Sequence, residues 1–153
     1  MIVVNPIHTE LARYAEYELP PIRPGTDVVL FSAIAKYIID MGWYDREFIS
    51  KYTEGFEDWV RSLNAFTLDF AEEVTGVPKD IIKEVAKLYA LEKPSMIMWT
   101  LGITEHENGT ENVSSLINLA LLTGNVGKPG AGLMRLGDRI MFKEGGLMLG
   151  VRR

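Results

Sequence analysis

The stretch from Trp99 to Gly132 constrains the fold of this chain more than any other part of its sequence. It reads WTLGITEHENGTENVSSLINLALLTGNVGKPGAG, in which an apolar strand end is followed by a polar loop over 102–109, an apolar helix and a glycine-rich turn. Open parallel sheets bind their ligands just beyond the carboxyl ends of their strands. The stretch therefore predicts an α/β fold with a ligand site in loop 102–109.

The other predicted strands are few. Residues 1–4 form a β-branched run that ends at Asn5-Pro6, and 95–99 form a continuously apolar run. Strands of the second kind are typical of a sheet covered on both faces, so Met96 and Met98 are expected in the core. With only two or three strands visible, the predicted fold class is α/β, with a partial Rossmann-like parallel sheet flanked by helices.

Helices account for most of the remaining sequence. Apolar residues recur at the i, i+3, i+4, i+7 spacing of a buried helix face, and polar residues that cap helices precede several of these segments. Expected caps are Thr26 or Asp27, Asp45, Thr67, and Asn108 or Thr110, and Gly76 is an expected left-handed helix stop. Helices are predicted at 8–17, 27–41, shortly after Asp45, 55–65, 68–75, from Val77-Pro78 to about 91, and 110–122.

Composition limits the function classes. A length of 153 residues suits one domain, and a net charge of −5 argues against binding to nucleic-acid phosphates. No apolar run approaches the ~20 residues of a membrane span, and the start lacks the layout of a signal peptide, so a cytoplasmic location is expected. The absence of cysteine excludes a disulfide or a cysteine-bound cluster in this chain, and with two histidines an all-protein metal site is not expected.

Two polar turns are candidate nucleotide contacts. Asn5–Thr9 follows the first strand, and Pro24–Asp27 opens a helix, where backbone N–H groups are free to bind a phosphate or a base. The Asp27 carboxylate can accept hydrogen bonds from the N–H donors of a guanine edge. The alternative is that Asp27 is simply a helix cap, and the two roles are compatible.

Two other motifs invite a catalytic or phosphate-binding interpretation. Glu105-His106 has the residue types of an acid/base pair, but a histidine in a polar loop is more often solvated, so neither residue is assigned a catalytic role. The glycine run 124–132 follows a helix and has Pro129 after Lys128, whereas a Walker loop must precede its helix. The run is better interpreted as a helix stop followed by a close backbone approach.

Taken together, these stretches resemble the catalytic subunit of the molybdopterin oxidoreductases, the dimethyl sulfoxide reductase superfamily, and most closely its formate dehydrogenase-like branch. The resemblance covers about 1–136, and 137–153 form a divergent tail. The motifs that carry it are RPGTD (23–27), GWYDREFISKYTEGF (42–56), EEVTGVPKDIIKEVAKLYA (72–90), GITEHENGTENVSSLINLALLTGNVGKPGAG (102–132) and the following LMRL.

The resemblance implies that 1–136 form part of a domain that binds molybdopterin guanine dinucleotide with molybdenum or tungsten, with a helical insert at about 43–91. It implies no catalytic residue and no metal ligand in this chain. By position, the strand-end loop contacts the dinucleotide, the turn before the first long helix surrounds the guanosine, and two residues line the pterin. In that order, the implied cofactor-binding residues are Asn5, Pro6, Ile7, His8 and Thr9; Gly25, Thr26 and Asp27; and Leu101 and Glu105.

The sequence also departs from the family pattern. The family commonly has Asp-Pro-Arg where this chain has Asn5-Pro6-Ile7, and glutamine where it has Glu105. Gly137 stands where the family has an arginine, which is catalytic in formate dehydrogenases. Arg135 or Arg139 takes that place only after a shift of register.

The expected function is that of a fragment or split subunit of a molybdenum- or tungsten-dependent oxidoreductase, inactive by itself. Its expected partners are complementary chains with the iron-sulfur and carboxyl-terminal domains, or further copies in a homo-oligomer. One alternative is a non-catalytic remnant that serves as a binding or assembly module through an open sheet edge. Another is a generic mononucleotide-binding protein, whose melting temperature GTP or GDP would raise.

Overall fold

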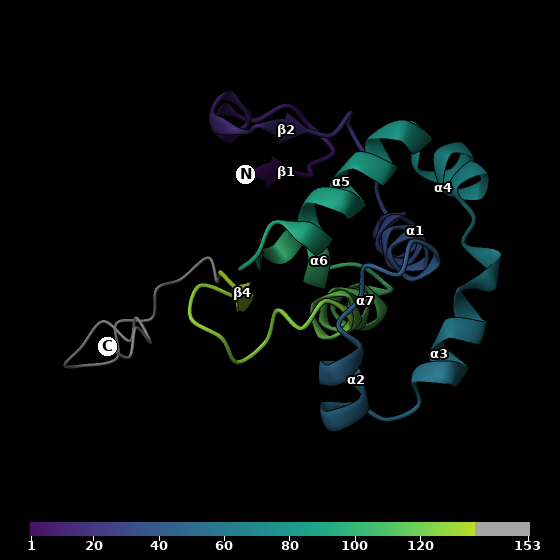
Figure 1. Ribbon diagram of the computed structural model, residues 1–153. Coiled ribbons are helices and arrows are strands. Elements are labelled where there is room, and N and C mark those ends of the chain that lie inside the picture. Colours follow the sequence, from purple (N-terminus) through teal and green to yellow (C-terminus); the bar gives the residue numbers. More distant parts are fainter. Residues whose placement is uncertain (137–153) are drawn as a thin grey trace.

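Three helices form the centre of the molecule in a computed structural model that describes residues 1–136. They are α1 (Asp27–Asp40), α5 (Lys79–Leu91) and α7 (Gly109–Leu122). Both α5 and α7 pack against α1, as Figure 1 shows. Because α1 has neighbours on several sides, it is buried along most of its length: Leu30, Phe31, Ser32, Ala33, Ile34, Ala35 and Ile38 are all buried. The hydrophobic core is therefore a helical one.

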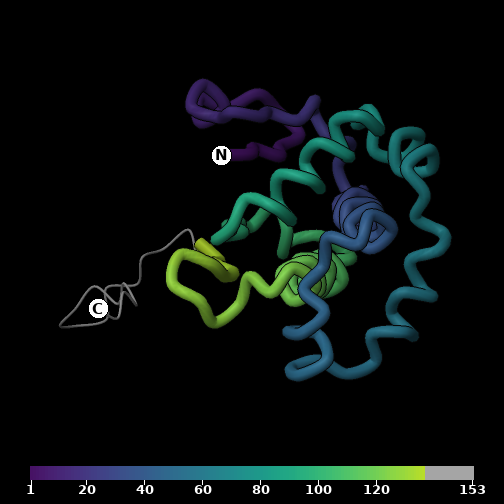
Figure 2. The backbone as a smooth tube through the Cα atoms, viewed as in Figure 1, coloured from purple at the N-terminus to yellow at the C-terminus, as the bar shows by residue number. Residues whose placement is uncertain are grey.

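The predicted insert leads from α1 to α5 as short helices. These are α2 (Arg46–Tyr52), α3 (Phe56–Ser62), the 3-10 turn η2 (Leu63–Ala65) and α4 (Leu68–Thr75). Figure 2 shows that this part of the chain runs around the outside of α1 and α7 before it returns to α5. The insert thus lies on the side of the helices away from the strands.

Local sequence signals in the insert are confirmed. The Asp45 side chain accepts a hydrogen bond from the N–H of Phe48 at 2.9 Å, and Thr67 accepts one from Phe70 at 3.2 Å. Gly76 ends α4 with φ of 78°. These caps satisfy N–H groups that the first turn of a helix leaves without a partner.

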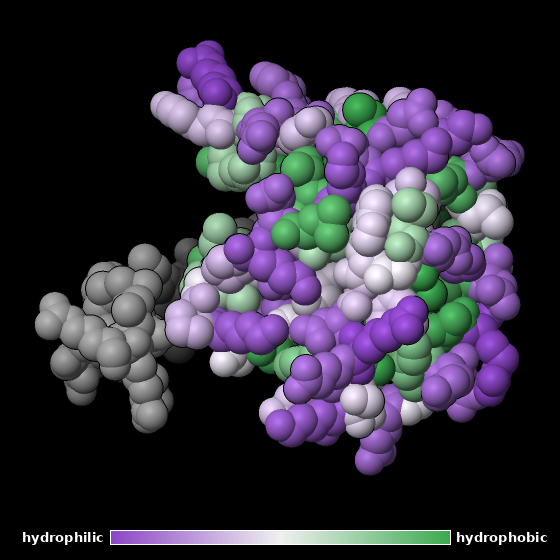
Figure 3. Space-filling model, viewed as in Figure 1, coloured by the Kyte–Doolittle hydropathy of each residue, from purple (hydrophilic) through white to green (hydrophobic). Residues whose placement is uncertain are grey.

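The strands form two separate pairs. β1 (Ile2–Val3) pairs in parallel with β2 (Tyr17–Glu18), and β3 (Met96–Trp99) pairs in parallel with β4 (Gly132–Arg135). Each sheet has two strands, and no ladder joins them within residues 1–136. Figure 3 shows the surface indented between the N-terminal segment and the residues near β4. The fold is α/β with short parallel sheets, as predicted.

The prediction of a helix at 8–17 is wrong except for one short turn. Only Glu10–Tyr14 are helical, as the 3-10 element η1. Tyr17 instead pairs with Ile2, and Leu19 donates its N–H to the carbonyl of Val3 at 3.0 Å. Pairing with β1 therefore prevails over the weak helical signal.

The expectation that β3 is covered on both faces is also wrong. Met96 is 41% exposed and Met98 is 57% exposed, whereas Ile97 and Trp99 between them are partly buried against the core. On β4, Met134, opposite Met98 in the register, is 41% exposed as well. One face of this sheet therefore presents methionine side chains to the surface.

The glycine run after α7 ties that helix to β3. Gly124 adopts φ of 66°, which confirms the helix stop; a Cβ there would lie 2.5 Å from the Asp45 carboxylate, so the close approach is to a side chain and not to the backbone as expected. The buried Asn125 accepts a hydrogen bond from the N–H of Ser95 at 3.2 Å and donates one to Thr123 at 2.9 Å. The run thus positions the start of β3.

None of the helices within residues 1–136 combines the length and apolar character that crossing a membrane requires. The segment 137–153, which is predicted to be a divergent tail and contains Gly137 and Arg139, lies outside the described residues.

Candidate functional site

The turn at the start of α1 holds the first group of predicted site residues. Gly25 has φ of 81°, and the hydroxyl of Thr26 donates to the carbonyl of Arg23 at 2.7 Å. Thr26 is the N-cap residue, and no side chain caps this helix. The expectation that Thr26 or Asp27 caps the helix is confirmed in position for Thr26, although its side chain makes no capping hydrogen bond. The N–H groups of Val29 and Leu30 donate to the Thr26 carbonyl at 3.1 and 3.2 Å, so the helix start can offer a ligand only the N–H groups that precede them.

Asp27 is the most unusual residue of this turn, because only 9% of it is exposed. Burial raises the pKa of its carboxyl, while its own backbone N–H and His106 act in the opposite direction. His106 belongs to the polar loop after β3, so the fold brings the turn 24–27 close to the loop 102–109. A buried carboxylate is costly unless it is paired, so Asp27 is a candidate binding residue.

The loop after β3 begins as a short helix, α6 (Leu101–Thr104), where the sequence predicted only a loop. Leu101 is partly buried, and Glu105 is exposed and donates its N–H to the Leu101 carbonyl at 2.8 Å. Helix α6 lies directly against the start of α7: a Cβ on Gly109 would lie 2.3 Å from the carbonyl oxygen of Thr104. Gly109 is therefore needed to hold Leu101 and Glu105 beside α7.

Buried polar atoms without a partner cluster around α6. Within the described residues, no hydrogen bond satisfies the Trp99 Nε1, Thr104 Oγ1 or Asn112 Oδ1 atoms. Asn112 is fully buried, and its amide donates to the Ile103 carbonyl at 3.0 Å. Buried polar groups in folded proteins are nearly always hydrogen-bonded. Buried polar groups at the carboxyl end of β3 therefore lack hydrogen-bond partners in the part of the chain that the structure describes.

The loop after β1 stands apart from these two segments. Asn5 accepts a hydrogen bond from the N–H of Ile7 at 3.1 Å, and His8 Nδ1 lies 2.6 Å from the Glu18 carboxylate. Pro6 and Ile7 are exposed, and Thr9 is partly buried. Among the hydrogen bonds and ion pairs of residues 1–136, none joins Asn5–Thr9 to the turn 24–27 or to the loop 102–109.

The residues present suit a polar organic ligand better than a metal. Across residues 1–136, no three histidine, cysteine, aspartate or glutamate side chains lie together as metal ligands. The buried Asp27 carboxylate, the first turn of α1 and the unpartnered atoms near α6 are instead donors and acceptors for a nucleotide or pterin. On these observations the chain fits the organic part of the implied cofactor.

Sequence reasoning missed Trp99, Thr104 and Asn112. The burial of Asn112 could have been predicted from the sequence, because it lies four residues before Leu116 and seven before Leu119 on the buried face of α7. A polar residue at such a position needs a partner, and that need marks a candidate site.

Comparisons with known proteins identify the family of this chain. Residues 1–146 match the family described as molybdopterin oxidoreductase. The chain is 38% identical over 133 residues to formate dehydrogenase H of Escherichia coli, which covers 87% of this chain and 18% of that protein. It is 36% identical to the alpha subunit of a formate dehydrogenase from Methanococcus maripaludis, covering 87% of this chain and 20% of that one.

A solved structure shows the same fold. Acetylene hydratase from Pelobacter acetylenicus superposes with a TM-score of 0.80 at 29% identity, over 84% of this chain and 18% of its own. The chain thus spans about a fifth or less of the length of these relatives. With a family match over most of its length and similar relatives among the formate dehydrogenases, the chain belongs to the molybdopterin oxidoreductase family.

Proposed function

We propose that residues 1–136 supply part of the cofactor-binding domain of a formate dehydrogenase-like oxidoreductase, with the insert at about 43–91 as a structural support. In this proposal the chain contacts one molybdopterin guanine dinucleotide. The observation that carries it is the buried Asp27 carboxylate at the start of α1, which is close to His106 and accepts a hydrogen bond from its own backbone N–H but from no other residue among those described.

Asp27 recognises the guanine. Its carboxylate accepts hydrogen bonds from the ring N–H and the amino group of the base, an arrangement that adenine cannot match because its corresponding edge lacks these two donors. Hydrogen bonds to a charged acceptor contribute about 1.5–3 kcal/mol each. Gly25 and Thr26 shape the turn, and the first-turn N–H groups of α1 face the phosphate side.

Helix α6 binds the pterin end. Leu101 provides an apolar contact, and the unpartnered Thr104 and Asn112 oxygens lie next to it as acceptors for pterin N–H groups. Glu105 adds a negative charge that weakens binding to a polyanion. The loop Asn5–Thr9 supplies a further contact on the dinucleotide.

The metal in the cofactor, molybdenum or tungsten, supplies the two-electron chemistry, and this chain binds and orients the cofactor. Formate oxidation is the activity that the names of its relatives favour. The remaining domains come from complementary chains, or from further copies in a homo-oligomer, and the assembly is cytoplasmic.

A second candidate function rests on a different observation. The open edges of β1 and β3 and the exposed methionines of β3 suit a non-catalytic module that binds a partner by strand addition. Neighbouring reading frames discriminate the two proposals. Frames that encode the cysteine-rich and carboxyl-terminal regions of the family favour a split enzyme, and their absence favours the module.

The test of cofactor binding compares GDP with ADP on the full chain by isothermal titration. We expect GDP to bind more tightly than ADP, and Asp27→Asn to reduce the GDP affinity about tenfold or more, because the charged acceptor is lost. Glu107→Gln is the matched control, since it removes an exposed charge from the same loop as His106. Equal affinity for the two nucleotides, or an Asp27→Asn variant that binds GDP normally, would contradict the proposal.

A further inference from the structure

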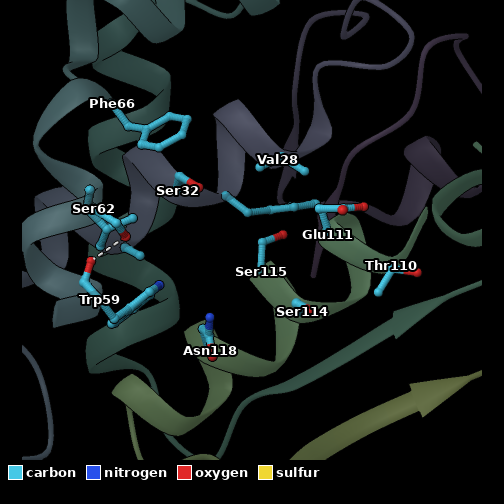
Figure 4. Close-up of a pocket in the computed structure, with 13 residues that line it drawn as sticks. Val28, Ser32, Trp59, Ser62, Phe66, Thr110, Glu111, Ser114, Ser115 and Asn118 are labelled. Atoms are coloured by element: carbon cyan, nitrogen blue, oxygen red, sulfur yellow. Dashed lines mark hydrogen bonds between the residues drawn. The ribbon is translucent and has the colours of Figure 1, made fainter. Parts of the chain in front are cut away.

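A pocket of about 330 Å³ lies on the insert side of the molecule, between α1, α3, η2 and α7. Figure 4 shows side chains from all of these elements around it. None of the residues proposed above for cofactor binding lines this pocket. Its volume is at the lower end of the range for small-molecule sites, about 300–1,000 Å³. It is therefore a separate feature from the cofactor site.

The base and sides of the pocket are apolar. Phe31, Ala35 and Leu63 are buried and form its base, and the partly buried rings of Trp59 and Phe66 stand beside them. Figure 4 shows these two rings on the same side of the pocket, opposite the α7 side chains. Such a lining accommodates an aromatic or aliphatic body of small size.

One hydroxyl in the pocket makes no hydrogen bond to the described part of the chain. Ser62 donates to the Trp59 carbonyl at 2.6 Å, and Ser115 donates to the Asn112 carbonyl at 2.7 Å. Ser32 is only 7% exposed and forms no side-chain hydrogen bond within residues 1–136. Its oxygen points into the pocket in Figure 4. The hydroxyl is therefore free to donate to, or accept from, a ligand with a hydrogen-bonding group.

The lining of the pocket carries negative charge. Glu111, in the first turn of α7, is the one ionisable side chain among the lining residues, and no ion pair engages it within the described part of the chain. The faces of tryptophan and phenylalanine rings also attract cations. Both features favour a positively charged ligand over a neutral or negative one.

We propose that this pocket binds a small organic cation, an amine that carries an aromatic or aliphatic body. The body lies on Phe31, Ala35 and Leu63 beside the Trp59 and Phe66 rings. The ammonium group faces the Glu111 carboxylate and donates to the Ser32 hydroxyl. This site goes beyond the proposed cofactor binding and does not depend on it.

The experiment uses phenethylamine as the probe and phenylpropionate as a control of similar shape and opposite charge. Backbone amide spectra of the full chain are recorded during each titration. We expect phenethylamine to bind with a millimolar dissociation constant and to shift amides of α1, α3 and α7 that line the pocket. Phenylpropionate should bind at least about fivefold more weakly, since its charge is repelled by Glu111.

Two variants test the assignment. Glu111→Gln should weaken phenethylamine binding about fivefold, whereas Glu107→Gln, outside the pocket, should leave it unchanged. Ser114→Phe places a ring at the exposed rim and should block binding without disturbing the buried core. The proposal is overturned if no saturable shift occurs at the lining amides, if both probes bind equally, or if Glu111→Gln has no effect.

Discussion

The helices and the strands of this molecule differ in how fully their apolar side chains are buried. Leu30 on α1 and Ile82 on α5 are fully buried, whereas Met96 and Met98 on β3 are 41% and 57% exposed. The helices bury their apolar faces against one another, but within residues 1–136 each two-stranded sheet leaves both of its outer edges unpaired. Two-stranded sheets are marginally stable on their own. The helical part therefore carries the stability, and the strands depend on what surrounds them.

Paired alanine substitutions in the two regions test this contrast most strongly. Leu30→Ala should destabilise the chain by about 2–5 kcal/mol, because it leaves a cavity in the helical core. Met98→Ala should change the free energy of unfolding by less than about 0.5 kcal/mol, because its side chain is already exposed. Urea denaturation of both variants measures the difference. Similar losses in the two variants would show that the sheet is as well packed as the helices.

A glycine pair tests the contact between α6 and α7. Gly109→Ala should cost about 1–3 kcal/mol, because its Cβ would overlap the Thr104 carbonyl. Gly102→Ala has open space around the new methyl group and should be neutral or slightly stabilising. Amide shifts at Leu101 and Glu105 should accompany only the first substitution. If Gly109→Ala left these amides in place, α6 would not be held by this contact.

Asn125 tests the connection between the two regions. Asn125→Ala should cost about 1–3 kcal/mol, because it leaves the Ser95 N–H without its acceptor and removes the hydrogen bond that the Thr123 hydroxyl accepts. Asn64→Ala, at an exposed position of η2, is the control and should have little effect. Hydrogen exchange at β3 should accelerate in the first variant. Unchanged exchange would mean that Asn125 does not position the strand.

The pH dependence of Asp27 is the smallest expected effect. Burial raises the folded-state pKa of this carboxyl above 3.8, its value in the unfolded chain. The folded protein therefore holds this proton more tightly than the unfolded chain, and the free energy of unfolding falls as pH rises from 3.8 through the folded-state pKa. Asp27→Asn lacks this contribution, and the difference between the two stability curves from neutral pH to below 3.8 isolates it. The GDP preference should fall in the same interval as the pH decreases, because guanine recognition needs the ionised form. A pH-independent difference would contradict the assigned burial.

The same contrast explains what the sequence could predict. Asp45, Thr67 and Gly76 mark helix ends through local chemistry, and the structure confirms them. The exposure of Met96 and Met98 could not be read from β3, because an apolar run looks the same whether or not a neighbouring layer covers it. At the candidate site, the sequence predicted the turn 24–27 and the loop 102–109 as cofactor contacts, which stays a prediction, but not their proximity, which depends on how α1 and α7 pack.

The central claim is that this chain contributes cofactor binding to a larger oxidoreductase. The most direct measurement is metal and nucleotide analysis of the chain recovered from its native host together with its bound partners. The account predicts molybdenum or tungsten in the complex, together with GMP released from the cofactor by acid hydrolysis. A complex recovered intact without metal, pterin or GMP would contradict it.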